Sequence, residues 1–197
     1  MIYDTQALNF KYINYSNINQ KISLETKRNN LYRIKRGLYT DDLKRDCLVI
    51  SNVNCSPSYI SFEYALSYYG LIPEHVSVIT AATFGKKNNK TYQLPDICFQ
   101  YMSIPNEVFS KGITFLTSEN NVRFKIANKE KALCDQLYSS YPVRSIKDLK
   151  ILLYDDLRID YEELIKLDMD FIKEIAPMYK SNTLNTFVKY IDEELMQ

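Results

Sequence analysis

The sequence predicts an α+β fold: a small N-terminal winged helix-turn-helix, then a mixed domain with an antiparallel sheet and a helical C-terminal tail. Three observations predict it. Helical segments precede a basic, alternating hairpin within residues 1–46. Runs rich in β-branched and aromatic residues then alternate with turn residues up to about residue 127. Periodic helical patterns occupy most of residues 128–197.

The length and composition are those of an ordinary globular protein. The chain has 197 residues, of which 46% are hydrophobic and 25% charged, so it can bury a sizeable core. We expect two domains, residues 1–46 and 47–197. No apolar run reaches the ~18 residues that span a bilayer, and the first residues lack signal-peptide features. The sequence therefore predicts a cytoplasmic protein with no membrane partner.

The metal-ligating residue types are few and scattered. The cysteines are Cys47, Cys55, Cys98 and Cys134, in no C-x-x-C pairing, and His75 is the single histidine. A zinc site would need ligands from distant segments. Only four glycines are present, too few for a phosphate-binding loop. We expect free thiols, no metal and no cofactor.

The first 30 residues are expected to form two helices. The first would cover residues 4–12, and the second would begin at a cap, Ser16 or Asn17, and continue to about Asn30. The side chains expected to face inward on the second helix are Ile18, Ile22 and Leu24.

A basic hairpin follows at residues 31–40. Strict alternation predicts two different faces. One face would carry Leu31, Arg33, Lys35 and Gly37, and the other Tyr32, Ile34, Arg36 and Leu38. Residues 11–36 hold seven cations and one acid, a net charge of +6, whereas residues 150–197 carry −5. Helices followed by a basic wing are typical of a nucleic-acid reader.

This pattern assigns roles to individual residues. Cations on the wing would contact DNA phosphates, with tyrosine hydroxyls beside them. The phosphate contacts expected on the wing are Arg33, Lys35, Arg36, Tyr32 and Tyr39. Amide and lysine side chains on the second helix would face base edges. The helix residues expected to contact DNA are Asn17, Asn19, Gln20, Lys21, Lys27 and Arg28. The alternative is a helix–hairpin scaffold with solvated lysines.

The second domain is expected to open after a charged connector at residues 41–46. Its clearest helix covers residues 61–69, with Ser61 as the N-cap and Gly70 as the left-handed residue that lets Leu71 pack back on Leu66. Strands are expected at residues 76–84, 97–104, 113–116 and 122–127. Lys86, Lys87 and Lys90 form a basic loop that would contact DNA or an acidic partner, or simply act as a solubilising turn.

The tail is expected to be helical and acidic. Asn128 would cap a helix over residues 129–138, with further helices at 145–153, 161–167, 170–179 and 183–196. Its carboxylates include Asp155, Asp156, Glu162, Glu163, Asp168, Asp170, Glu193 and Glu194. A metal-dependent nuclease would need such groups to converge on an ion. Solvated helix faces explain them more simply, so we expect no enzymatic activity.

Four segments, taken together, resemble a known family. Residues 31–39, 57–74, 79–83 and 127–138 stand in the order found in AbiEi-type antitoxins of type IV toxin–antitoxin systems, which act in abortive infection and phage defence. The resemblance implies an N-terminal winged helix-turn-helix that binds inverted repeats in its own promoter and represses its operon. It also implies a C-terminal antitoxin domain that counters a nucleotidyltransferase-type toxin without a stable complex, and it implies no catalytic residues.

Two other functions remain open from the residues. One is a stand-alone DNA-binding transcriptional regulator whose second domain senses another signal. The other is a metal-dependent nuclease or transferase that uses the tail carboxylates.

Overall fold

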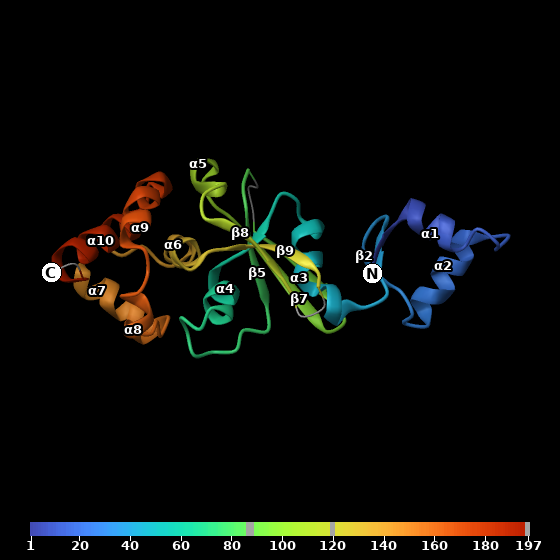
Figure 1. Cartoon of the computed structure of the whole chain (residues 1–197), viewed down its shortest axis with the longest axis horizontal. Helices are drawn as coiled ribbons and strands as arrows, with labels where there is room; N and C mark the ends of the chain where they lie inside the picture. Colours follow the sequence, from blue (N-terminus) through green and yellow to red (C-terminus); the bar gives the residue numbers. More distant parts are fainter. Residues whose placement is uncertain (86–88, 119–120, 196–197) are drawn as a thin grey trace.

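The computed structural model describes residues 1–85, 89–118 and 121–195. The molecule is elongated, with a small N-terminal lobe at one end, a six-stranded sheet in the middle and the C-terminal helices at the other end (Figure 1). The predicted α+β class is confirmed. Among the described residues, no helix has both the length and the apolar character needed to cross a membrane.

The N-terminal lobe, residues 1–40, is called the head. It contains β1 (Ile2–Asp4), α1 (Thr5–Lys11), α2 (Ile18–Lys27), β2 (Tyr32–Lys35) and β3 (Leu38–Thr40). β3 is the central strand and pairs antiparallel with β1 and β2. Asp4 caps α1 by accepting from the N–H of Ala7, and Asn17 caps α2 by accepting from the N–H of Gln20. The predicted order of helix, turn, helix and hairpin is present.

The head has a small core of its own. That core consists of Leu8, Tyr12, Ile22 and Leu31, with Tyr3 and Tyr39 partly buried against it. The buried positions of α2 are Ile22 and Glu25. Leu24, which was expected to face inward, is instead exposed, because neighbouring positions on a helix point about 100° apart.

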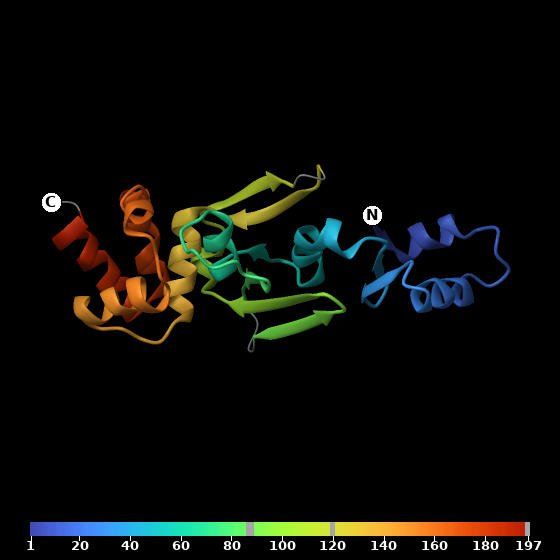
Figure 2. The ribbon, with the colours of Figure 1, turned by 90° about the horizontal axis from the view of Figure 1, so that it is seen from below.

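The opposite face of the head sheet packs against the rest of the chain. Ile34 is buried in the main core, and Ile2, Tyr32 and Leu38 pack against it. The contact runs through α3 (Leu43–Asn54), which lies between the head and the large sheet (Figure 2). The expected boundary between residues 46 and 47 thus falls inside a helix, and the connector expected at residues 41–46 is mostly helical.

The large sheet has the order β6-β7-β5-β4-β9-β8. Its strands are β4 (Tyr59–Ile60), β5 (Ile79–Thr83), β6 (Lys90–Leu94), β7 (Ile97–Ser103), β8 (Ile113–Thr117) and β9 (Arg123–Ala127). The expectation of an antiparallel sheet is correct for β4–β5, β6–β7 and β8–β9. It is wrong for β5–β7 and β4–β9, which are parallel.

The parallel pairs arise because, in the β6–β7 and β8–β9 hairpins, the second strand lies nearer the centre of the sheet than the first. β7 follows β6 but lies between β6 and β5, so β5 and β7 run in the same direction. Likewise β9, not β8, neighbours β4. The sequence patterns of the individual strands do not specify which strand of a hairpin faces the sheet centre, since both carry apolar residues.

Two helices pack on the centre of the sheet. α4 (Phe62–Tyr68) and α6 (Lys129–Ser139) contact each other, and α5 (Asn106–Phe109) links β7 to β8. The predicted end of α4 is confirmed: Gly70 has φ +72°, and the N–H of Leu71 donates to the carbonyl of Leu66 at 2.9 Å. Asn128 caps α6 by accepting from the N–H of Lys131.

The tail is helical, as predicted. It comprises α7 (Ile146–Lys150), the π-helical turn η1 (Ile151–Asp156), α8 (Tyr161–Leu164), α9 (Met169–Ile175), the 3₁₀ turn η2 (Ala176–Tyr179), α10 (Asn182–Tyr190) and the π-helical turn η3 (Ile191–Leu195). These helices gather around α6 at the end of the molecule opposite the head (Figure 1).

Candidate nucleic-acid interface

A groove of about 560 Å³ lies in the head between α2 and the β2–β3 hairpin. Its lining residues are Thr5, Asn19, Ile22, Ser23, Thr26, Lys27, Arg33, Arg36, Gly37 and Tyr39. Five of the residues predicted to contact DNA meet here: Asn19, Lys27, Arg33, Arg36 and Tyr39. They come from segments as far as 20 positions apart in the chain, and only the folded head brings them to one surface.

The helix side of the groove is one face of α2. Asn19, Ser23, Thr26 and Lys27 stand at positions i, i+4, i+7 and i+8, which fall on one side of a helix. Ser23 and Thr26 were not predicted as part of the site. The hydroxyl of Ser23 can donate to phosphate or base edges, whereas the hydroxyl of Thr26 donates to the carbonyl of Ile22 at 2.9 Å. The same helical spacing from Asn19 would have identified both residues.

The hairpin side of the groove depends on the strand register. Arg33 lies directly opposite Tyr39, and Tyr39 lies opposite Tyr3 on β1. Gly37 has φ +77°, and a Cβ there would stand 3.1 Å from Oγ1 of Thr5. A glycine therefore closes the hairpin tightly against the start of α1.

The strict alternation expected along β2 is wrong. The register between β2 and β3 shifts between Arg33 and Lys35, so Ile34 is the extra residue of a bulge. Alternation would place Lys35 beside Arg33. In the structure Arg36 lines the groove with Arg33, and Lys35 does not.

Lys35 instead binds the end of α3. Its Nζ donates to the carbonyl oxygens of Val53 at 2.7 Å and Asn54 at 3.3 Å. Carbonyl groups in the last turn of a helix lack intrahelical partners and carry partial negative charge, so a lysine is favourable there. Lys35 thus ties the wing to the second part of the chain and is a poor candidate for a phosphate contact.

Lys21 and Asn17, two of the expected base readers, are also engaged within the head. Nζ of Lys21 lies 2.8 Å from Oε1 of Glu25 and 4.6 Å from the ring centre of Tyr15. The hydrogen bond from Lys21 lowers the pKa of Glu25, with Asn30 as a second donor. The Oδ1 of Asn17 caps α2. The remaining expected readers are Asn19, in the groove, and Gln20, exposed beside it.

The cations at the groove are exposed and available. Lys27, Arg33 and Arg36 are exposed, as is Arg28 at the end of α2. Within residues 1–85, 89–118 and 121–195, none of these four forms an ion pair with an acid. Unpaired guanidinium and ammonium groups along a concave surface are suited to bind phosphates. The groove can therefore hold a polyanion.

The structure describes only part of the basic loop predicted in the second domain. Lys86 and Lys87 lie outside the described residues. Lys90 is exposed at the start of β6 and belongs to the large sheet, so it does not line the head groove.

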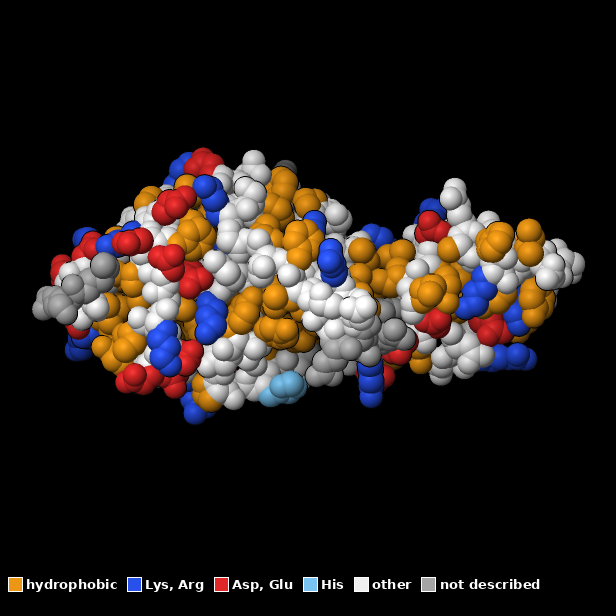
Figure 3. Space-filling view, in the orientation of Figure 1, with side chains coloured by type: hydrophobic (Ala, Val, Ile, Leu, Met, Phe, Trp, Pro, Cys, Tyr) orange, Lys and Arg blue, Asp and Glu red, His pale blue; other side chains and the backbone are white. Residues whose placement is uncertain are grey.

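The tail carboxylates serve the local structure. Asp168 caps α9, and Glu163 pairs with Lys129 and Lys166. Hydrogen bonds from those lysines lower the pKa of Glu163, the bond from Lys166 most. Figure 3 shows acidic and basic side chains mixed over the tail helices. Among the described residues, no group of three or more His, Cys, Asp or Glu side chains is placed to hold a metal ion.

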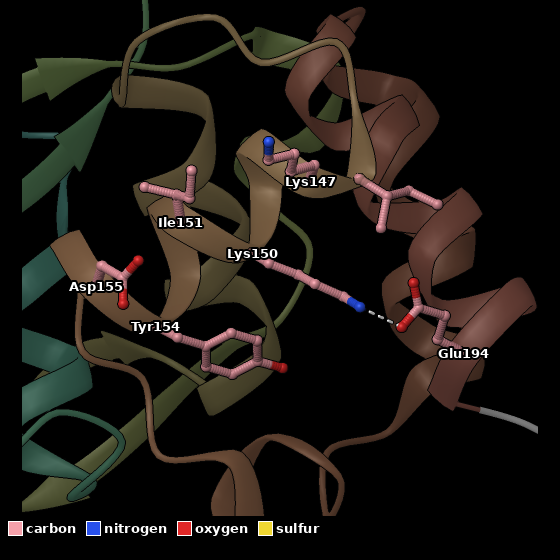
Figure 4. A pocket seen from close by; sticks show the side chains of 7 residues that line it. Lys147, Lys150, Ile151, Tyr154, Asp155 and Glu194 are labelled. Carbon is pink, nitrogen blue, oxygen red and sulfur yellow. Dashed lines mark hydrogen bonds and ion pairs between the residues drawn. The ribbon is translucent and has the colours of Figure 1, made fainter.

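A shallow pocket of about 530 Å³ lies among the tail helices (Figure 4). Lys150 of α7 reaches across it and pairs with Glu194 of η3. The carboxyl group of Asp155 lies on the other side of the pocket, away from Glu194. The two acids therefore do not converge as a catalytic pair would.

A buried polar cluster joins the sheet to the tail. Asp135 on α6 accepts hydrogen bonds from Tyr59 and Ser61 at one oxygen and from Lys131 and Tyr179 at the other. Burial lowers the pKa of Lys131 and raises the pKa of Tyr59 and Tyr179. Since Lys131 and Asp135 have no exposed surface, the cluster is a structural link and not a binding site.

In comparisons with known proteins, no family model matches the chain, and no curated protein matches it.

Proposed function

We propose that this protein is a cytoplasmic DNA-binding autorepressor and antitoxin of the AbiEi type. The observation that carries the DNA-binding half is the groove between α2 and the wing, where Lys27, Arg33 and Arg36 are exposed and form no ion pair with an acid of the described residues. Phosphates of a duplex would lie against these cations, and Asn19 and Gln20 at the start of α2 would face base edges.

The antitoxin half rests on the four sequence segments that together resemble AbiEi-type antitoxins. Two of these segments, residues 57–74 and 127–138, contain Tyr59, Ser61, Lys131 and Asp135 of the buried cluster. The protein would oppose a nucleotidyltransferase-type toxin encoded beside its own gene. It would do so through residues 47–197, without catalysis of its own and without a stable complex.

The DNA-binding half is tested with the purified full chain. Fluorescence anisotropy would compare DNA from upstream of its own gene with scrambled DNA over a salt series. We expect tight, salt-sensitive preference for the upstream DNA. The double variant Arg33→Ala, Arg36→Ala should bind both DNAs more weakly and flatten the salt slope by about two, because each phosphate contact contributes about one. The double variant Lys147→Ala, Lys189→Ala, which removes two exposed cations of the tail helices, is the matched control.

Equal affinity for upstream and scrambled DNA would contradict the autorepressor role. Absence of binding at low salt would contradict DNA binding by the head altogether.

The antitoxin half is tested by growth. Cells that express the neighbouring nucleotidyltransferase should recover when the full chain is co-expressed. They should also recover with the Arg33→Ala, Arg36→Ala variant, because that variant loses DNA binding only. Specific DNA binding without rescue would instead identify a stand-alone transcriptional regulator.

A further inference from the structure

β8 is an open edge of the large sheet. It is the last strand in the order β6-β7-β5-β4-β9-β8, and within the described part of the chain its one partner is β9. Figure 2 shows β8 on the outer side of its hairpin, with no other described segment beyond it. An open edge presents backbone N–H and C=O groups that can pair with another strand.

The register of β8 on β9 identifies which backbone groups are open. The N–H of Asn128 donates to the carbonyl of Gly112, and the N–H of Ser118 donates to the carbonyl of Val122. In an antiparallel ladder, hydrogen-bonded pairs alternate with pairs that are not bonded to each other. Residues 112, 114, 116 and 118 therefore point their backbone groups at β9, and residues 113, 115 and 117 point theirs away.

A side chain on the opposite side of the hairpin confirms this register. Lys125, which stands opposite Phe115, directs its N–H and C=O away from β8 and onto the amide of Asn52 in α3. The backbone N of Lys125 lies 2.6 Å from Oδ1 of Asn52, and Nδ2 of Asn52 lies 3.2 Å from the carbonyl oxygen of Lys125. The inner side of β9 is thus closed by Asn52 where β4 ends, whereas the outer side of β8 has no such cover among the described residues.

We propose that β8 pairs antiparallel with β8 of a second copy of this chain, around a two-fold axis at Phe115. The open groups belong to Ile113, Phe115 and Thr117, which are evenly spaced about Phe115. An antiparallel mate in this register joins Phe115 to Phe115 and Ile113 to Thr117, and every pair is of the hydrogen-bonded kind. The edge is complementary to itself, as a two-fold interface requires.

The side chains of β8 also suit pairing with β8 of a second copy. Residues 113–117 read Ile-Thr-Phe-Leu-Thr, with no charge and no proline. Charged residues and proline commonly protect natural edge strands from pairing with other chains. β6, at the other edge of the sheet, begins with such a charged residue, Lys90. A self-pairing strand must avoid like charges across its axis. Phe115 is 64% exposed, and pairing across the axis would cover it.

The groove beside Phe115 extends the proposed interface. A hollow of about 560 Å³ lies between α3 and the β8–β9 hairpin, lined by Val49, Val53 and Phe115 among others. The lining also includes the cations Arg123 and Lys125, and the ring of Phe115 from the second copy would stand next to the apolar part of the hollow. The inference does not depend on DNA binding, although a two-fold dimer would carry two heads with the symmetry of an inverted repeat.

The first test is the oligomeric state of the full chain by analytical ultracentrifugation over a wide concentration series. We expect a reversible dimer. Phe115→Lys should raise its dissociation constant by about tenfold or more, because two ammonium groups would face each other at the axis. Thr91→Lys, an exposed position on the other edge strand, should leave the dimer unchanged. Circular dichroism would verify that both variants fold.

A monomer at every concentration would overturn the proposal. A dimer that Phe115→Lys leaves intact, or that both variants weaken equally, would also overturn it, since the interface would then lie elsewhere.

The second test is cross-linking and does not require the edge to be disrupted. Opposed residues of a hydrogen-bonded pair have Cα atoms about 5.5 Å apart, within the range of a disulfide. Phe115→Cys should therefore form a covalent dimer under mild oxidation. The wild-type chain, with its own free cysteines, and Thr91→Cys are the controls. Cross-linking of Phe115→Cys no faster than these controls would contradict the two-fold axis at residue 115.

Discussion

Lys131 and Asp135 lie one turn apart on α6, with Nζ 2.5 Å from Oδ1, and neither side chain has any exposed surface. The pair is complete because other elements supply the remaining hydrogen bonds. Tyr179 of η2 contacts both members, while Tyr59 of β4 and Ser61 bind the second carboxylate oxygen. The pair thereby joins the sheet, α6 and the tail in one buried network.

We expect Lys131→Met to lower the free energy of unfolding by about 3–5 kcal/mol, because it leaves a buried carboxylate without its cation. Urea denaturation followed by circular dichroism measures this. Lys147→Met, on an exposed position of α7, should change it little. Adding Asp135→Leu to Lys131→Met should restore part of the loss. A single variant as stable as wild type would show that the pair contributes nothing.

Two adjacent cations of the wing should behave differently. Arg36→Ala should weaken DNA binding and reduce the salt slope by about one, because Arg36 lines the groove. Lys35→Ala should leave the slope unchanged and lower stability by about 1 kcal/mol, since it removes hydrogen bonds to the end of α3. Anisotropy titrations and urea denaturation of both variants separate the two effects. The reverse pattern would place Lys35 at the DNA.

Gly112 occupies a position that only glycine fits. Its φ is +63°, and an added Cβ would stand 2.8 Å from Cβ of Lys131 and 2.8 Å from Oδ1 of Asn128. We expect Gly112→Ala to cost about 2 kcal/mol or more, from backbone strain and from the collision with α6. Gly70 also has a positive φ but open space around it, so Gly70→Ala should cost only about 1 kcal/mol. Equal losses would argue against close packing at Gly112.

Stability should fall at alkaline pH. Burial raises the pKa of Tyr69 to about 12 from its ordinary value of 10.0, and the hydroxyl donates to the carbonyl of Ala127. Between these two values the unfolded chain loses the tyrosine proton while the folded protein keeps it. The stabilising effect is thus complete below pH 10 and is lost as pH rises toward 12.

Urea denaturation at a series of pH values measures this dependence. Tyr69→Phe should show a shallower decline above pH 10 than wild type. Tyr161→Phe, which changes an exposed tyrosine, should decline as wild type does. A Tyr69→Phe variant that follows wild type throughout would exclude this residue as a source of the decline.

The local elements of this protein could be predicted from its sequence. The helix at residues 62–68 ends as its Gly70 and Leu71 indicated, and Asn17 and Asn128 cap the helices that follow them. Such features depend on residues within a few positions of one another. Part of the candidate site was predictable for the same reason, because Arg33, Arg36 and Tyr39 belong to one recognisable basic hairpin.

Other features were misread because their cause lies outside the segment. Residues 41–46 read as a charged connector, yet α3 begins at Leu43, and Leu43 and Ile50 are buried on one side of that helix. Lys35 belongs by alternation with Arg33, but the bulge at Ile34 and the carbonyls of α3 draw it to the other side.

The sequence by itself determined the α+β class, the capped helices and the basic composition of the head, since propensity, capping and charge act over short distances along the chain. Only the tertiary structure decided which cations share a groove, which strands run parallel, and that Lys131 and Asp135 meet two distant tyrosines. These outcomes depend on bulges, on the order of strands in the sheet and on burial, which arise from contacts between segments far apart in the sequence.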